Sequence, residues 1–254
     1  MTNPIVMVHG AFVGGWTFET FRKPFEDAGH EVIAPDLRGH GAADPLDAVI
    51  GLSVRDYARD IVALCRTLPA RPILVGHSLG GLVAQMAARK VQPAALVLLG
   101  PTPPWGLAGW SVKEAITAFG AQMVSLLSNG RVDPSREIMR RMLLGRLNDI
   151  EAAPILARLR PESARAVREA LNWWLDPFMT SSIGPGPLPT RSLVISGQDD
   201  HVHPVASGRL VAERIGGEFL SLPRMTHWML SEAGWETVAA TALDFIGDET
   251  RIAA

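Results

Sequence analysis

One serine in the chain has a setting that suits nucleophilic catalysis. Ser78 is the middle residue of a Gly-x-Ser-x-Gly pattern over 76–80, which follows an apolar run and precedes an alanine-rich stretch. A glycine on each side allows a tight strand-to-helix turn that lifts the hydroxyl toward solvent. The pattern alone is common, and its simpler interpretation is a glycine-rich turn capped by Ser78. The strand and helix patterns on either side favour a nucleophile elbow.

A serine hydroxyl needs a base within hydrogen-bond reach, and the sequence offers three histidines after Ser78. Two of them, His201 and His203, lie in one polar loop. His227 lies between an apolar run over 218–222 and the last helical stretch, so it is expected at the carboxyl ends of the strands, where Ser78 also emerges. We therefore predict His227 as the general base. The alternative is a histidine in a surface loop.

The acid that orients the base is expected in the loop after the strand that ends near residue 196. Asp199 and Asp200 are adjacent there, and only one of the two carboxylates can point inward. The other would serve as a turn or capping residue. The same loop could be interpreted as a metal site formed with His201 and His203. Adjacent turn positions rarely converge on one ion, so we predict no metal.

An attacked carbonyl develops negative charge on its oxygen, which preorganised N–H groups can stabilise. One predicted donor is the backbone N–H of Leu79, directly after the nucleophile. The other is expected in the loop over 9–16 that follows the first strand, where we favour Ala11 and keep Phe12 as the competitor. The Phe12 side chain is also a candidate for the wall of the substrate pocket.

These residues need a scaffold, and apolar runs that alternate with amphipathic stretches predict one. Strands linked through helices form a parallel α/β sheet with helices on both faces. The expected strands cover 5–8, 31–34, 72–75, 94–99, 192–196 and 218–222. The expected helices cover 16–28, 53–68, 79–91, 204–215 and a last one capped by Ser231 that ends near 246.

The alternation stops between residues 101 and 189. This segment shows no strand-like run, and helical stretches are expected over 112–127, 135–147 and 164–174. We predict an α/β core made of 1–100 and 190–254, with 101–189 inserted as a helical cap. Aromatic side chains of this cap either fill its own core or wall an apolar pocket over Ser78. The residues are Trp105, Trp110, Trp173, Trp174 and Phe178, of which Trp105 is the best pocket candidate.

Composition bounds the class of protein. A chain of 254 residues can bury a sizeable core, and its net charge of −2 with scattered basic residues argues against nucleic acid or an anionic membrane as the main partner. Cys65 is the only cysteine, which excludes an internal disulfide and a thiolate cluster. We find neither a secretion signal nor a membrane span, so a soluble cytoplasmic protein is expected. The oligomeric state is left open.

Together, the motifs resemble the α/β-hydrolase superfamily over nearly the whole chain. Because the acid of this family usually lies three residues after the glycine at 197, the resemblance favours Asp200. The chain resembles the compact branch that includes plant methyl esterases and hydroxynitrile lyases. The lyases tend to carry threonine at the place of Ala11 and lysine at the place of Trp228. The matching segments are His9 and Gly10 with Trp16 downstream, 36–41, 76–81, 197–204 and 227–228.

The predicted function is a cofactor-independent serine hydrolase, foremost a carboxylesterase for small to medium apolar esters with an acyl-serine intermediate. Hydrolysis of a thioester, a lactone or a carbon–carbon bond uses the same residues. So does a lyase or perhydrolase built on this scaffold. A protein of another class, a small-molecule receptor, is the remaining alternative. The aspartate nucleophile of dehalogenases and epoxide hydrolases is absent, because Ser78 stands in its place.

Overall fold

Six parallel strands form the centre of the molecule. The computed structural model describes residues 2–107 and 130–252. The sheet has the order β2-β1-β3-β4-β7-β8. Since β2 and β3 lie on opposite sides of β1, the strand order reverses between β1 and β3, and a crevice forms there at the carboxyl ends of the strands. The strands are β1 (Ile5–Val8), β2 (Val32–Ile33), β3 (Ile73–His77), β4 (Ala95–Leu99), β7 (Ser192–Gly197) and β8 (Glu218–Leu222).

The inner strands are apolar on both faces because both faces are covered. In β1, Val6 and Val8 pack into the core on one side of the sheet, whereas Ile5 and Met7 pack into the core on the other side. This alternation is the two-residue period of an extended chain. Parallel sheets are normally covered on both faces in this way, which explains why these strands are continuous apolar runs.

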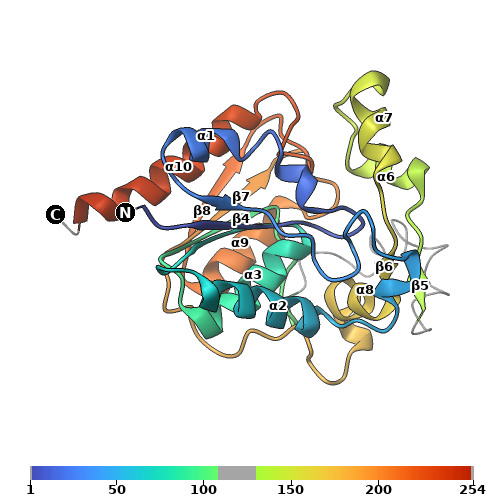
Figure 1. Ribbon diagram of the computed structural model, residues 1–254, viewed down its shortest axis with the longest axis horizontal. Coiled ribbons are helices and arrows are strands. Elements are labelled where there is room, and N and C mark those ends of the chain that lie inside the picture. The colour runs from blue at the N-terminus through green and yellow to red at the C-terminus, as the bar shows by residue number, and fades with distance from the viewer. Residues whose placement is uncertain (1, 108–129, 253–254) are drawn as a thin grey trace.

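Helices cover the two faces in separate layers, as Figure 1 shows: α1 and α10 lie on one face, and α2, α3 and α9 lie on the other. The predicted doubly covered α/β sheet is therefore confirmed. Among the described residues, no helix is long and apolar enough to cross a membrane. The helices of these layers are α1 (Lys23–Asp27), α2 (Val54–Thr67), α3 (Leu79–Val91), α9 (Val205–Ile215) and α10 (Trp235–Ile252).

Two predicted helix starts are wrong. The helix expected over 16–28 is divided into a 3-10 turn, η1 (Gly15–Phe18), and α1, which carries Pro24 in its first turn. Proline suits that position but not a helix interior, so a new helix begins there. The last helix begins at Trp235, after Gly234 with φ +98°, and not at Ser231. The Ser231 hydroxyl instead accepts a hydrogen bond from Trp228 Nε1 at 2.7 Å.

The segment 101–189, called the insert below, contains more than helices. Its short strands β5 (Arg131–Val132) and β6 (Glu162–Ser163) pair antiparallel, which the sequence did not predict. The helix expected over 135–147 ends at Met142, and the one expected over 164–174 ends at Leu171. The described residues of the insert include η4 (Trp173–Leu175), α6 (Arg136–Met142), α7 (Asp149–Ala157) and α8 (Ala164–Leu171). Trp110 and the helix predicted over 112–127 lie outside the described residues.

Helix α7 was not predicted because Pro154 lies within it. Its start is nevertheless strong, since Asn148 and Glu151 form a reciprocal capping box in which each side chain accepts a backbone N–H from the other. Core helix α2 has the same device, formed by Ser53 and Asp56.

Buried polar groups join the insert to the core. One carboxylate oxygen of Glu169, in α8, accepts hydrogen bonds from the Ser53 hydroxyl at 2.7 Å and from the Val54 N–H at 3.0 Å. The insert thus supplies a charged acceptor to the N-terminus of α2, where unpaired N–H groups and the helix dipole favour an anion. Figure 1 shows α6, α7, α8 and the β5–β6 pair at the end of the sheet toward which the strands run.

Candidate active site

Ser78 has a strained backbone that its surroundings enforce. It sits between β3 and α3 with φ 53° and ψ −123°, a region that residues with a side chain rarely adopt. A Cβ at Gly76 would lie 2.6 Å from the carbonyl oxygen of Gly80, and a Cβ at Gly80 would lie 2.1 Å from that of Val8. Glycine is required at both positions, because any side chain would push α3 off the sheet. The elbow predicted from the pattern over 76–80 is formed.

Asp200 and His227 meet at the same edge of the sheet. Asp200 follows β7, His227 follows β8, and Asp200 Oδ2 lies 2.8 Å from His227 Nδ1. Both side chains are buried. The other carboxylate oxygen accepts the N–H groups of Val202 and His203, each at 2.8 Å. Asp199 is exposed and points elsewhere, 3.9 Å from Arg146, so the structure pairs Asp200 and not Asp199 with the histidine.

The surroundings keep the Asp200 carboxylate ionised. Burial alone would raise its pKa. The charge of His227 and the hydrogen bonds from His227 and from the His203 N–H outweigh burial and lower the pKa of Asp200 below its usual value. An ionised Asp200 accepts the Nδ1–H of His227 and leaves Nε2 as the free ring nitrogen.

Two further histidines hold His227 in place. His77 Nε2 lies 2.8 Å from the carbonyl oxygen of His227, and the rings of His77 and His203 flank the His227 ring at 4.8 and 5.3 Å between centroids. Burial, with repulsion by His227 second, lowers the pKa of both His77 and His203 to about 3. These two rings are therefore neutral near pH 7, so neither forms an ion pair with the Asp200 carboxylate in place of His227.

Ser78 and His227 line one cavity of about 50 Å³. Among the described residues, neither the Ser78 hydroxyl nor His227 Nε2 makes a hydrogen bond, including one between them. Hydrogen bonds of this kind are often long in ligand-free structures and shorten when a substrate binds. Gly10 provides the room beside the serine, since a Cβ there would lie 3.5 Å from Ser78 Oγ.

The two predicted oxyanion donors lie beside the serine. Ala11 and Leu79 both line the cavity. In the described part of the chain neither backbone N–H donates a hydrogen bond, as is usual for the first residue of a helix such as Leu79. Phe12, the competitor, also lines the cavity and has φ 66°. Its carbonyl oxygen accepts the N–H of Arg160 at 2.9 Å, which ties this loop to the insert.

Val202 and His203 add a wall from the loop after β7, and further wall residues that were not predicted come from the insert. Met139 and Leu143 lie four residues apart at α6, and Val167 and Leu171 lie four residues apart on α8. Residues at this spacing share one face of a helix. The spacing is visible in the sequence, but nothing local shows that these two faces turn toward Ser78.

Trp105 is not among the residues that line this cavity, and its predicted place in the pocket wall stays a prediction. Its indole Nε1 donates to the carbonyl oxygen of Asp176 at 3.0 Å, and its ring packs edge-on against Trp173 at 5.4 Å. The indole N–H thus has its hydrogen-bond partner inside the insert. Trp105 and Trp173 follow the other interpretation of the aromatic residues, packing within the insert.

Gly100 lies directly under the Asp200–His227 pair. A Cβ at this position would lie 3.0 Å from Asp200 Oδ2 and 3.4 Å from His227 Nδ1. Its φ of +47° is also one that favours glycine. The sequence analysis did not identify this residue, whose role depends on the close approach of three separate loops.

A second buried acid–histidine pair was also missed. Glu162 of β6 lies 3.0 Å from His40 Nε2 and accepts the Tyr57 hydroxyl at 2.6 Å, and all three side chains are buried. Burial alone lowers the pKa of His40, but the charge and hydrogen bond of Glu162 outweigh it and raise that pKa. Burial raises the pKa of Glu162, whereas the interactions with His40, Tyr57 and the Ser163 N–H lower it overall.

Within the described ranges, no group of three or more histidine, cysteine, aspartate or glutamate side chains could hold a metal ion. The metal site considered around Asp199, Asp200, His201 and His203 is therefore not formed there. Asp200 is already bonded through both oxygens, to His227 and to two backbone N–H groups.

Comparison with known proteins gives a consistent picture. Residues 5–241 match the model of the alpha/beta hydrolase family. Methylesterase 3 of Arabidopsis thaliana is 37% identical over 86 residues, which is 33% of this chain and 32% of that protein. The non-heme chloroperoxidase of Burkholderia pyrrocinia is 28% identical over 90% of this chain and 86% of its own length.

The strongest sequence matches are thus partial, since the matched region spans about a third of the length of the plant methylesterase. Among solved structures, a methylesterase from Arabidopsis superimposes with a TM-score of 0.75 at 20% identity, covering 97% of this chain and 99% of that one. At that identity the likeness concerns the fold.

Proposed function

The chain belongs to the alpha/beta hydrolase family, and from this premise and the geometry around Ser78 we propose that it is a serine carboxylesterase for small to medium apolar esters. The observation that carries the proposal is that Ser78 and His227 share one cavity, while His227 is hydrogen-bonded to the buried Asp200. A nucleophile and a base therefore border the same cavity, and the base is bonded to the group that orients it.

In the proposed first half-reaction, the Ser78 oxygen attacks the ester carbonyl carbon as His227 Nε2 takes the hydroxyl proton. The carbonyl oxygen becomes negative and accepts hydrogen bonds from the N–H groups of Leu79 and Ala11, with Phe12 as the alternative donor. The C–O bond to the alcohol then breaks. His227 returns the proton to the departing alkoxide, so an alcohol leaves and an acyl-Ser78 ester remains.

In the second half-reaction, a water molecule attacks the acyl carbon and gives a proton to His227. The bond to the Ser78 oxygen breaks, the proton returns to that oxygen, and a carboxylic acid is released. Asp200 keeps Nδ1 protonated and stabilises the imidazolium in both halves. The proposed chemistry needs no cofactor, because proton transfer and acyl transfer are complete within these groups.

The cavity bears on the substrate. The cavity of about 50 Å³ is several times the roughly 10–15 Å³ that the same measure requires for one water molecule. It therefore fits a short acyl group, and its walls from α6 and α8 are aliphatic. We propose that the acyl portion binds there and that longer chains require these helices to shift.

The division into a core over 1–100 and 190–254 and a cap over 101–189 stays a prediction.

The proposal is tested by labelling and by turnover. A fluorophosphonate probe should label the wild-type chain once, at Ser78, and p-nitrophenyl acetate and butyrate should be hydrolysed. Ser78→Ala should abolish the label and lower kcat by at least about 10³-fold. Ser221→Ala, a serine on β8 outside the cavity, is the matched control and should retain both.

Hydrolysis that survives in Ser78→Ala would overturn the assignment. A labelled protein without turnover of esters, thioesters or lactones would favour the receptor alternative.

A perhydrolase is the second candidate, favoured by the similarity to a protein named a non-heme chloroperoxidase over 90% of this chain. Hydrogen peroxide would take the place of water as the acceptor of the acyl group, releasing a peracid. Peracid formation from an ester and hydrogen peroxide, faster than ester hydrolysis, would support it.

A further inference from the structure

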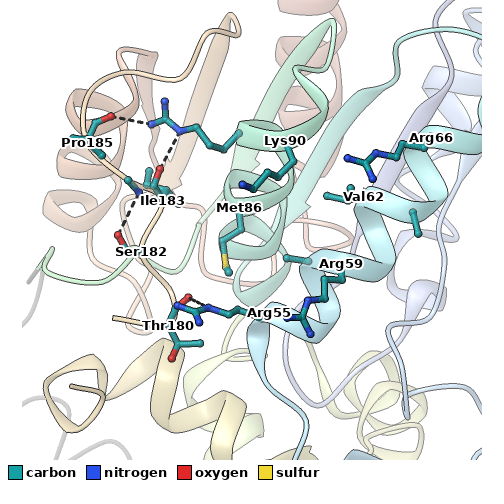
Figure 2. Close-up of a pocket in the computed structure, with 14 residues that line it drawn as sticks. Arg55, Arg59, Val62, Arg66, Met86, Lys90, Thr180, Ser182, Ile183 and Pro185 are labelled. Carbon is teal, nitrogen blue, oxygen red and sulfur yellow. Dashed lines mark hydrogen bonds between the residues drawn. The ribbon is translucent and has the colours of Figure 1, made fainter. Parts of the chain in front are cut away.

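A second concave site lies away from the serine. It is a groove of about 710 Å³ between α2, α3 and the segment 180–185, and it shares no lining residue with the cavity at Ser78. Figure 2 shows Arg55 and Arg59 beside Thr180 at one end, Arg66 and Lys90 toward the other, and Met86 between them. Its volume falls in the range of small-molecule sites.

The lining has a strong excess of positive charge. Of the fourteen lining residues five are cationic, namely Arg55, Arg59, Arg66, Arg89 and Lys90, and none is acidic. The whole chain carries a net charge of −2, so this accumulation is local. A concave surface lined by one sign of charge concentrates ions of the opposite sign.

Most of this charge is not neutralised by the protein. Arg59 forms an ion pair with Asp56 at 3.1 Å. Within the described ranges, no carboxylate forms an ion pair with Arg55, Arg66, Arg89 or Lys90. Arg66 and Lys90 are exposed and make no hydrogen bond to a described residue, so both heads can reach a ligand.

Two of the arginines also build the wall of the groove. Arg89 donates to four backbone carbonyl oxygens within 183–187, those of Ile183, Pro185, Gly186 and Pro187, at 2.9 to 3.3 Å. Arg55 donates to the carbonyl oxygen of Thr180 at 3.2 Å. The segment is therefore held against α2 and α3 before any ligand arrives, which reduces the entropy lost on binding. Neutral carbonyl partners leave the arginine charges uncompensated.

The floor of the groove is apolar. Ala58, Val62 and Ala63 from α2, Met86 from α3 and Ile183 from the opposite wall lie among the cationic groups. Val62 and Met86 are only half-buried, so their side chains offer contact area to a ligand. The complementary molecule has an apolar body and a strongly anionic group.

We propose that this groove binds a small organic phosphate, a phosphomonoester or diphosphate group on an apolar body. The uncompensated charges of Arg66 and Lys90, which Figure 2 shows toward one end of the groove, match a group with two negative charges better than a single carboxylate. A phosphomonoester carries nearly two charges at pH 7 and three acceptor oxygens. Guanidinium groups match phosphate oxygens in pairs, and Lys90 adds a point charge. This site does not depend on the proposed esterase function.

Calorimetric titration of the full chain tests the proposal, with 1-naphthyl phosphate as the probe. We expect it to bind more tightly than inorganic phosphate or pyrophosphate, which lack the ring. It should also bind more tightly than 1-naphthoate, which has one charge, and 1-naphthol, which has none. Tighter binding of pyrophosphate than of inorganic phosphate would assign the site to diphosphates. Equal binding of 1-naphthoate and 1-naphthyl phosphate would overturn the choice of phosphate.

The discriminating variant is Arg66→Ala/Lys90→Ala, which removes two exposed cations whose side chains make no hydrogen bond to a described residue. Each lost charge-assisted contact should weaken 1-naphthyl phosphate binding roughly tenfold. The matched control is Lys23→Ala/Arg136→Ala, two exposed cations on α1 and α6 with the same change in net charge.

Binding that is unchanged in Arg66→Ala/Lys90→Ala, equally weakened in the control, or undetectable in the wild type would overturn the site. So would loss of binding after a fluorophosphonate has blocked Ser78, since the probe would then occupy the cavity at the serine. Thermal unfolding of each variant confirms that the chain is folded in every measurement.

Discussion

Asp200 and Glu162 are both buried carboxylates that bond to a histidine, at 2.8 and 3.0 Å, yet the two pairs differ in what the far nitrogen of the ring does. His40 has a backbone carbonyl oxygen, that of Arg38, 3.1 Å from its Nδ1. His227 has no hydrogen-bond partner at Nε2 among the described residues, and this residue lines the cavity.

This difference sets the protonation of each ring. His40 faces an acceptor on both sides, and an imidazole can donate to two acceptors only when it is doubly protonated. Its raised pKa agrees with that state. His227 donates only to Asp200, so its second nitrogen keeps a lone pair that can take a proton. A carboxylate and an imidazole thus form a closed ion pair in one place and an available base in the other. The difference lies in the second ring nitrogen, which faces a backbone carbonyl oxygen in His40 and no hydrogen-bond partner among the described residues in His227.

The largest expected effect is that of Asp200→Asn. Asparagine retains the shape but cannot hold His227 with Nδ1 protonated, so kcat for p-nitrophenyl acetate should fall by about 10⁴-fold while the protein stays folded. Steady-state kinetics and a urea titration measure the two quantities. A fall of less than about tenfold would remove Asp200 from the proposed mechanism.

Glu162→Gln is the matched exchange in the other pair, and it should give the opposite result. It leaves the imidazolium of His40 buried without a counter-ion, and breaking a buried pair in this way costs about 3 kcal/mol or more. The free energy of unfolding should fall accordingly, with a far smaller change in kcat than Asp200→Asn produces. If Glu162→Gln lowers kcat as much as Asp200→Asn does, the contrast between the two pairs is wrong.

A smaller effect is expected when the Asp200–His227 pair is displaced but kept. Gly100→Ala would place a Cβ against both side chains, and misplacement of catalytic groups by about 1 Å can cost roughly 100-fold in rate. Gly106→Ala is the control, because Gly106 also has a positive φ, +84°, but nothing within 4 Å of its Cβ. Equal kcat losses in both variants would mean that backbone strain alone is responsible.

The smallest effect expected from any single residue is on the pH dependence of the free energy of unfolding. Burial lowers the pKa of His9, His77 and His203 to about 3 from the usual 6.5. Between these two pKa values the three histidines bind protons in the unfolded chain but not in the folded protein. The free energy of unfolding should therefore drop as the pH falls from 6.5 toward 3, by about 1.4 kcal/mol per pH unit for each ring.

His40 acts in the opposite sense. Its pKa is raised, so its contribution is complete below pH 6.5 and is lost as the pH rises through the higher value of the folded state. Urea titrations at pH 7, 6 and 5 measure the slope. His77→Gln should lower the slope of the free energy of unfolding against pH by the contribution of one proton. A free energy of unfolding that does not change between pH 6.5 and 5 would contradict the burial of neutral rings.

Much of the scaffold could be predicted because its signals are local. Apolar runs marked the strands, and the pattern over 76–80 marked a turn whose glycines prove sterically necessary. The position of His227 and the loop that holds the acid followed from the rule that parallel strands end at one edge, whereas the choice of Asp200 over Asp199 followed from the resemblance to the α/β-hydrolase superfamily. That rule also explains why Ala11 and Leu79, which follow β1 and β3, lie together where the strand order reverses.

The insert could not be predicted in the same detail because its structure depends on long-range contacts. Glu162 and His40 are 122 residues apart, and neither has a local feature that announces the other. Strands β5 and β6 have two residues each, too few to show any periodicity. Trp105 was assigned to the pocket from its place after β4, but its orientation is set by a carbonyl oxygen 71 residues away.

The carboxylate that Glu169 places at the start of α2 has a consequence for engineering. Exchanging whole inserts between homologues is an attractive way to change the substrate range of such proteins. A transplanted insert lacking an acid at this position would leave the first turn of a core helix open to water, and the chimera would lose stability far from its new pocket. Donor segments should therefore be chosen first for an acidic residue at the position of Glu169, before any pocket residue is compared.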